Sequence, residues 1–280
     1  MNVILPEKQK GTKRRVAIYI AILTACVIAI GIAIYQFFSE EKLEVILGLS
    51  KAEDEKIEQL KSEFDEIFKN KIEYLENYQE NVRIKPDEEL VYIEYQRQEK
   101  VANNYDLNIN IPNINIDNNL AKKYNEDIKQ TFQIPVETIL QTENRNIIYT
   151  VNYVANIENN ILSLVILSTF KEGNSAQRTI VKTYNYNLST NQEVTLNEFL
   201  NLKEVDNNIV QNTIKREIQK SQEQTDKLKE LGYNVFLRDI NDSMYKIENT
   251  KEFFMYNGNL YLVYAYGNSN STSEMDLVIL

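Results

Sequence analysis

An uncharged stretch near the N-terminus constrains this chain more than any other feature. It runs from Val16 to Phe38 and reads VAIYIAILTACVIAIGIAIYQFF. A helix rises about 1.5 Å per residue, so this stretch would span roughly 34 Å, more than the roughly 30 Å of a bilayer's hydrocarbon core. Backbone groups in lipid must hydrogen-bond to one another, which favours a helix despite the many β-branched residues. A transmembrane helix is therefore predicted at residues 16–38.

The flanking charges predict the orientation of that helix. Lys13, Arg14 and Arg15 directly precede it, and two glutamates follow its end. Positive residues stay on the cytoplasmic side. Residues 1–15 are therefore predicted to be a cytoplasmic tail, and residues 39–280 to be extracellular, in a single-pass protein of the cell membrane. A cleaved signal peptide is the alternative, but its apolar region would have only about 7–15 residues, followed by small residues.

The charge is divided unevenly along the chain. Five basic residues against Glu7 give the first fifteen residues a charge of +4, so the remaining residues carry −14 of the total of −10. An acidic body repels phosphate backbones, which excludes nucleic acid as an expected partner. The same charge permits a cationic partner, although acidic surfaces also serve simply to keep proteins soluble.

Missing residue types exclude several kinds of active site. The chain has no His, and its single cysteine, Cys26, lies inside the apolar stretch. Ser-His-Asp and Cys-His catalysis, Cys/His zinc sites and disulfides in the outer domain are therefore excluded. Phosphate-binding and dinucleotide-binding glycine motifs are also absent, so no cofactor and no catalytic residue is expected. A glycosidase that uses paired carboxylates stays open, because a sequence cannot place two carboxylates across a sugar.

The segment after the apolar stretch has a helical pattern. Residues 40–82 contain one Gly and no Pro, and their apolar residues recur at three- and four-residue spacing. These residues are Ile57, Leu60, Phe64, Ile67, Tyr74 and Tyr78. A helical stalk is therefore predicted over residues 39–85. It would either pack on its own domain or associate with a second copy, since the repeat is too short to settle on a coiled coil.

The residues after Pro86 alternate between strand-like and helix-like patterns. Runs rich in β-branched and aromatic residues predict strands at 90–96, 105–111, 146–157, 161–171 and 178–188. An amphipathic pattern predicts a helix over 118–140, which Pro135 must kink or divide. The Asn pair at 159–160 predicts a β-hairpin turn, because Asn tolerates the left-handed conformation.

The C-terminal part begins with a capping box. Thr195 and Glu198 are three residues apart ahead of an apolar run, which predicts the start of a helix. A longer helix is predicted over 206–231, with Gly232 placed to end it. Strands are predicted at 252–256, 260–266 and 275–280. The first two join at the Asn-Gly-Asn sequence of residues 257–259, a strong hairpin signal.

This order of elements predicts an α+β fold. The chain would consist of the transmembrane helix, the helical stalk, and an antiparallel sheet with helices packed on it. The outer domain would cover residues 86–280 and have two linked parts, about 86–190 and 191–280.

Three stretches resemble a bacterial extracytoplasmic module of two linked parts. They are the strand at 108–114 with the helix around Tyr124, the strands and helix start from Ile161 to Leu196, and the closing hairpin from Phe253 to Tyr266. The module occurs in the lysozyme-sensing membrane anti-sigma-V factor and ahead of the catalytic domain of a peptidoglycan deacetylase.

The resemblance covers about residues 90–280. It implies a non-enzymatic, membrane-anchored binding or sensor module that faces the cell wall. Its partner would be a cell-wall glycan or a cationic protein such as lysozyme. The chain departs from the family in having no His for the deacetylase metal site and too short a cytoplasmic tail to hold a sigma factor. A structural or assembly protein that acts through association of its stalk and transmembrane helix is the alternative.

Four tyrosines of the closing segment are the candidate partner-binding residues. They are Tyr256, Tyr261, Tyr264 and Tyr266. Tyrosine offers an apolar face and a polar tip, which suits sugar rings and protein partners alike. Tyr264 and Tyr266 fall on one face of the predicted strand and Tyr261 on the other, so at least one set is expected to lie in the core.

Overall fold

The computed structural model describes residues 54–78 and 80–280. The predicted transmembrane helix at 16–38 and the topology residues Lys13, Arg14 and Arg15 lie outside these residues. Within the described part, none of the helices combines the length and the apolar character needed to span a bilayer. Residues Glu63–Leu280 form one compact unit, which contains both sheets.

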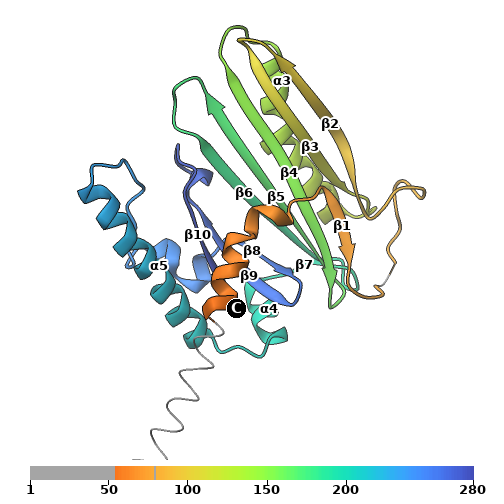
Figure 1. Cartoon of the computed structure of the whole chain (residues 1–280). Coiled ribbons are helices and arrows are strands. Elements are labelled where there is room, and N and C mark those ends of the chain that lie inside the picture. The colour runs from red at the N-terminus through yellow and green to blue at the C-terminus, as the bar shows by residue number, and fades with distance from the viewer. Residues whose placement is uncertain (1–53, 79) are drawn as a thin grey trace, which may run out of the picture. The chain divides into compact units, whose positions relative to one another are not determined.

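A large mixed sheet forms the first half of the unit (Figure 1). Its described strands are β1 (Lys71–Tyr74), β2 (Val91–Val101), β3 (Tyr105–Ile114), β4 (Ile147–Glu158), β5 (Ile161–Glu172), β6 (Arg178–Asn187) and β7 (Gln192–Glu193). They follow the order β2-β3-β4-β5-β6-β7, and β1 pairs with β4 beside that path. The predicted hairpin at 159–160 is confirmed, because Asn159 and Asn160 both have positive φ between β4 and β5.

The sheet is not purely antiparallel, and the prediction was wrong on this point. Strand β4 pairs in parallel with β3 along its first half and with β1 along its second half. The helical segment between β3 and β4 supplies the crossover that a parallel pair requires. Beyond Ile109 the two strands separate, and the side chain of Asn152 bridges the gap by accepting hydrogen bonds from Asn70 (2.9 Å) and Asn110 (3.1 Å).

The helical segment over one face of the large sheet contains a π-turn. It consists of α2 (Asn119–Ile128), η2 (Lys129–Gln133) and α3 (Ile134–Leu140). Asn118 caps its start by accepting a hydrogen bond from the Leu120 N–H. In η2 the Ile134 N–H bonds to the Lys129 carbonyl, five residues back, just before Pro135. The predicted division of this helix near Pro135 is thus confirmed, and it takes the form of a π-turn.

The predicted helical stalk ends earlier than expected. Residues 54–62 are helical, the 3₁₀ turn η1 (Phe64–Ile67) follows, and the chain then enters β1. The helix prediction was therefore wrong for residues 68–78 and 80–85. The reason lies at Asn70, which has a φ of 56° and exchanges two 2.9 Å hydrogen bonds with the backbone of Tyr153 on β4. Sheet pairing thus outweighs the local helical periodicity.

A smaller sheet with its own helices forms the second half. Its described elements are α4 (Leu196–Leu202), α5 (Asn207–Glu230), η3 (Ser243–Tyr245), η4 (Ile247–Asn249), β8 (Glu252–Tyr256), β9 (Asn259–Ala265), η5 (Tyr266–Asn268) and β10 (Met275–Ile279). The strand order is β10-β9-β8. The capping box of Thr195 and Glu198 and the turn at Gly258 are confirmed. Gly232, with a φ of 86°, follows the end of α5 as predicted.

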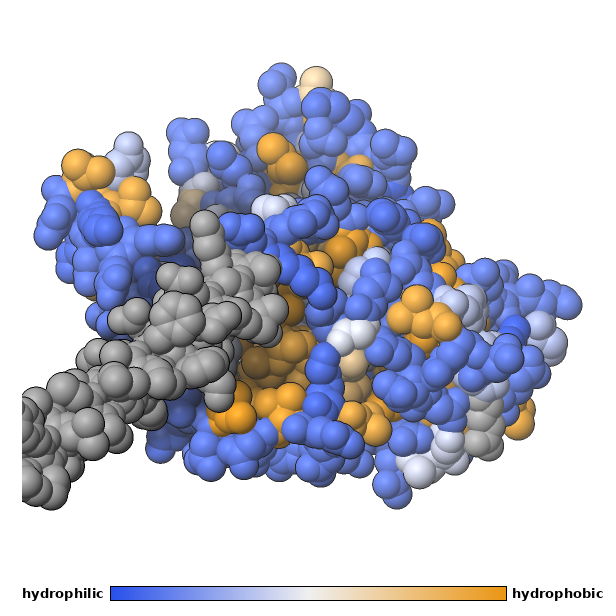
Figure 2. Space-filling model, turned by 60° about the horizontal axis from the view of Figure 1, so that its bottom comes forward, coloured by the Kyte–Doolittle hydropathy of each residue, from blue (hydrophilic) through white to orange (hydrophobic). Residues whose placement is uncertain are grey.

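Each half has its own apolar core. One cluster runs from Ile72 to Leu188 and lies between the large sheet and α2–α3. The other lies between the small sheet, α4 and α5, and it takes Ile161 from the large sheet. A separate patch of exposed apolar side chains occupies the end of α5 and the loop after it, at the left of Figure 2; it consists of Leu228, Leu231, Tyr233 and Leu237.

The edge of β8 meets the face of the large sheet through side chains. Four buried or half-buried polar residues make these bonds: Asn156, Ser163, Thr183 and Asn185. The Phe253 N–H donates to Thr183 (3.1 Å), and its carbonyl accepts from Asn185 (2.7 Å). The Met255 N–H donates to Ser163 (3.3 Å). Polar side chains therefore replace the neighbouring strand that the edge of β8 would otherwise need.

Side chains also satisfy the backbone groups along the free edge of β6. The carboxylate of Glu252 accepts hydrogen bonds from the Thr183 N–H (2.9 Å) and hydroxyl (3.1 Å) and lies 3.3 Å from the Lys182 ammonium. The Asn268 side chain bonds both the N–H and the carbonyl of Val181, at 3.0 and 2.9 Å. Glu252 is only 6% exposed, and these donors satisfy its buried carboxylate oxygens.

A glycine permits the close approach of β6 to η5. A Cβ on Gly267 would lie 1.8 Å from the Thr179 carbonyl oxygen and 2.6 Å from that of Thr272. The Gly267 carbonyl also accepts a hydrogen bond from Arg178 (2.6 Å). Both clashing atoms belong to the backbone, so no side-chain rotation would relieve them.

Replacing Glu252 by alanine should lower the free energy of unfolding by about 3 kcal/mol. The substitution leaves the Thr183 N–H without its acceptor and Lys182 without its partner. Denaturant unfolding followed by circular dichroism measures this change. The matched control is Glu248→Ala, which removes an exposed carboxylate from the preceding turn and should change stability by less than about 0.5 kcal/mol. Equal effects of the two variants would contradict the role given to Glu252.

Gly267→Ala should destabilise the unit by about 3 kcal/mol or more, because a methyl group at this position overlaps the β6 backbone. The free energy of unfolding should fall, and amide hydrogen exchange should accelerate along β6. Ser269→Ala, two residues away and exposed, serves as the control and should leave both measurements close to those of the parent chain.

Candidate functional site

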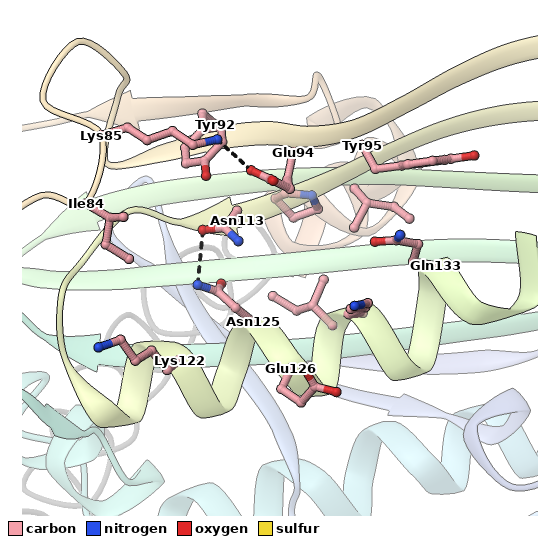
Figure 3. A pocket seen from close by; sticks show the side chains of 14 residues that line it. Ile84, Lys85, Tyr92, Glu94, Tyr95, Asn113, Lys122, Asn125, Glu126 and Gln133 are labelled. Atoms are coloured by element: carbon pink, nitrogen blue, oxygen red, sulfur yellow. Dashed lines mark hydrogen bonds and ion pairs between the residues drawn. The ribbon is translucent and has the colours of Figure 1, made fainter. Parts of the chain in front are cut away.

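A groove of about 650 Å³ lies between α2 and the β2–β3 edge of the large sheet (Figure 3). The strand wall presents Tyr92, Glu94, Tyr95, Ile111, Pro112 and Asn113. The helix wall presents Lys122, Asn125, Glu126, Ile128, Lys129 and Gln133. Ile84 and Lys85, from the segment before β2, complete the groove at one end. Its volume falls in the range of about 300–1,000 Å³ that is usual for small-molecule sites.

A β-bulge shapes the strand wall. The pairing of β2 with β3 shifts between Ile93 and Tyr95, so Glu94 has no partner residue on β3. Ile93 pairs with Pro112, which has no N–H to give to the ladder. A bulge re-aims side chains, and here consecutive residues Glu94 and Tyr95 both line the groove together with Tyr92.

The helix wall is a stripe of polar residues at helical spacing. Lys122, Glu126, Lys129 and Gln133 follow one another at intervals of four, three and four residues. Lys129 and Gln133 are the first and last residues of the π-turn η2. Both walls of the groove thus contain a backbone irregularity, and such irregularities are frequent at functional sites.

Asn125 fixes the two walls relative to each other. Its side-chain oxygen accepts the Ile114 N–H (2.8 Å), and its side-chain nitrogen donates to the Ile114 carbonyl (2.9 Å) and to Asn113 (3.1 Å). Figure 3 shows the Asn113–Asn125 bond crossing the groove. These bonds hold α2 against β3.

Lys85 lies at one end of the groove as a bridging cation. Its ammonium is 2.9 Å from the Glu94 carboxylate and 4.2 Å from the centre of the Tyr92 ring. The buried Asn115 fixes the Lys85 backbone, accepting from its N–H and donating to its carbonyl, both at 2.8 Å. Asn115 thus holds the backbone of Lys85 in place, and the exposed Lys85 side chain pairs with Glu94 at the end of the groove.

The pKa shifts in the groove arise from this same trio. A hydrogen bond from Tyr92, and next the ammonium of Lys85, hold the pKa of Glu94 below its usual range. Tyr92, followed by Glu94, raises the pKa of Lys85, whereas burial is the main reason that the pKa of Tyr92 is raised. Glu94 and Lys85 are therefore both charged at neutral pH.

The carboxylates of the groove lack the feature that a glycosidase requires. A glycosidase needs one carboxylic acid whose pKa is raised so that it can protonate the leaving group. Glu94 has the opposite shift, and the other groove carboxylate, Glu126, accepts a hydrogen bond from Gln130 (2.7 Å). Among the described residues, no cluster of His, Cys, Asp or Glu could hold a metal ion.

The four candidate tyrosines are buried, with exposures of 1–7%. Tyr261 stacks on Phe254 at 4.8 Å, and Tyr264 shares a hydrogen bond with Thr250. Burial, and next a hydrogen bond with Glu73, raises the pKa of Tyr256 to about 12. These contacts belong to the core, so the prediction of partner binding by these rings gains no support.

Tyr266 joins the most polar part of the small-sheet core. Its hydroxyl donates to Asp276, and its ring stacks on Phe236 at 4.0 Å. Asp276 is also paired with the buried Arg238 at 2.9 Å. This network attaches the loop after α5 to β10 and leaves Tyr266 inaccessible to a partner.

Sequence reasoning missed the groove, although two signals were present. Tyr92 and Tyr95 are two half-buried aromatic residues of one predicted strand, a residue type that is common at binding sites. The polar stripe from Lys122 to Gln133 is visible in the sequence. Only the fold, however, shows that the two segments face each other.

Comparisons with solved structures find DUF3298 family proteins of low sequence identity. No family model matches the chain, and no curated protein matches it. A DUF3298 family protein from Bacteroides fragilis is 12% identical with a TM-score of 0.34, covering 62% of this chain and 79% of its own. A DUF3298 family protein from Pseudomonas aeruginosa PAO1 is 10% identical with a TM-score of 0.37, covering 67% and 85%.

The Glu94 carboxylate should titrate at a higher pH when its donors are removed. Tyr92→Phe removes the hydroxyl and Lys85→Gln removes the ammonium, so each should raise the pKa of Glu94 towards its ordinary value of about 4.3. Side-chain carboxyl NMR across the acid range measures the shift. Because the folded pKa is the lower one, the stabilising contribution of Glu94 is present above the unfolded pKa and is lost as pH falls through the folded pKa.

Tyr95→Phe, in the same groove, is the control and should leave the Glu94 titration unchanged. If the pKa of Glu94 were unaltered in both Tyr92→Phe and Lys85→Gln, neither side chain would influence the Glu94 carboxylate, which would contradict the assignment.

Proposed function

We propose that this chain is a membrane-anchored, extracytoplasmic binding module that faces the cell wall, and that its groove binds a wall glycan without catalysing a reaction. The observation that carries the proposal is the composition of the groove, which combines two tyrosines with amide and charged side chains across two rigid walls. The predicted transmembrane helix at 16–38 and the acidic C-terminal body support the proposed location.

The groove offers both kinds of contact that a sugar makes. A pyranose ring has an apolar C–H face, which can pack on an aromatic ring, and a rim of hydroxyl groups, which need hydrogen-bond partners. Tyr92 and Tyr95 are half-buried, so each ring is held in place while part of it remains accessible. Asn113 and Gln133 bring amide groups to opposite walls, where they can pair with hydroxyls.

A cationic protein such as lysozyme is a second candidate partner, favoured by the charge of −14 beyond residue 15. Such a protein would bind outside the groove. The described groove side chains include three lysines and two glutamates, which makes the groove less acidic than the rest of the body. The two candidate partners therefore predict different footprints on the same domain.

Tyr95→Ala should weaken binding of the full chain to soluble chito-oligosaccharides and to solubilised peptidoglycan fragments by roughly tenfold. The expected size follows from losing one aromatic contact of about 1.4 kcal/mol. Calorimetric titration of the detergent-solubilised chain measures the affinity. Tyr233→Ala is the matched control, because Tyr233 is 63% exposed in the apolar patch after α5 and does not line the groove.

A parent chain that binds neither saccharide would overturn the proposal. Titration with lysozyme separates the second candidate, since lysozyme binding that persists in Tyr95→Ala would place that partner outside the groove.

A further inference from the structure

From the charges of the groove we infer that its ligand is an acidic saccharide, whose carboxylate pairs with Lys129 on the helix wall. This inference rests on the proposed function and adds the chemical class of the sugar. It depends on how each charged side chain of the groove is already engaged.

Most groove charges have a partner within the protein. Lys85 is paired with Glu94 at 2.9 Å, and Lys122 is paired with Asp117 at 2.7 Å. Lys129 differs, because it is exposed and forms neither an ion pair nor a side-chain hydrogen bond with any residue that the structure describes. It is therefore the ammonium group in the groove that is left for a ligand.

The helix places Lys129 where it can reach a bound sugar. Lys129 and Gln133 are the two ends of the π-turn and line the same groove as Tyr95. A sugar packed on the Tyr95 ring would thus lie beside the helix wall that contains Lys129. Figure 3 shows Tyr95 on the strand wall and Gln133 on the helix wall.

Because the rest of the domain is acidic, the ammonium of Lys129 bears on which ligands the groove can bind. An anionic ligand is repelled by a body of charge −14 unless a local cation compensates. A carboxylate at Lys129 would form a charge-assisted hydrogen bond, which is stronger than a bond between neutral groups. Glu126, one turn before Lys129, lies on the same wall and opposes the anion. Neutralising Lys129 should therefore weaken binding of an anionic ligand, whereas neutralising Glu126 should strengthen it.

The test compares two disaccharides that differ in one acidic substituent. The acidic probe is N-acetylglucosaminyl-N-acetylmuramic acid, and the neutral probe is N,N′-diacetylchitobiose. The parent chain should bind the acidic probe roughly fivefold more tightly at low ionic strength, and added salt should abolish the difference. Lys129→Gln should remove the preference, so that the acidic and the neutral probe bind this variant with similar affinity. Glu126→Gln should increase the preference.

Lys123→Gln provides the matched control. Lys123 is exposed on the same helix but does not line the groove, so this variant changes the net charge equally without touching the site. It should retain the parent preference. Equal affinity of the parent chain for both probes would overturn the inference and leave the proposed function intact, whereas binding of neither probe would overturn both. A preference that survives in Lys129→Gln would also overturn the assignment of Lys129.

Discussion

The fold of this unit depends on a junction at which the edge of one sheet meets the face of another. A strand edge must have hydrogen-bond partners when it is buried, and β8 finds them in Ser163, Thr183, Asn185 and Asn156 rather than in another strand. The edge of β6 is satisfied in turn by Glu252 and Asn268. Polar side chains therefore take the place of strand pairing, and they fix the two apolar cores at one relative position.

The groove depends on this arrangement only indirectly. It lies at the opposite edge of the large sheet, where β3, paired with β2, extends beyond its contact with β4. That extension gives α2 a surface to pack against, and Asn125 fixes the spacing. A ligand site at this edge can therefore vary in side chains without disturbing the junction between the two sheets.

Local signals allowed much of the secondary structure to be predicted from the sequence. The hairpins at Asn159 and Gly258 and the helix start at Thr195 follow from short-range backbone preferences, and the structure has all three. The parallel pairing of β4 was missed, because it depends on contacts with β1 and β3 that lie far away in the chain. The roles of Asn156 and Ser163 at the junction could not be predicted, because their partner on β8 is 99 and 92 residues away in the sequence.

The candidate site was missed for a related reason. Tyrosines near the C-terminus appeared suited to binding because tyrosine is common at interfaces, yet Tyr261 and Tyr266 are core residues. The rings of Tyr92 and Tyr95, by contrast, remain accessible because a bulge turns Glu94 and Tyr95 towards the same groove. A bulge depends on the partner strand, in this case on Pro112 of β3, and single-strand periodicity does not reveal it.

The aromatic turn η1 has a mechanical consequence. Phe64 packs against Phe68, Phe254 and Tyr261, immediately ahead of the four-residue strand β1. A pulling force applied on the N-terminal side of residue 63 would reach these rings before it reached the hydrogen bonds between β1 and β4. The contacts of Phe64 with Phe254 and Tyr261 would therefore transmit the force to the small sheet before it acted on the short parallel strand β1.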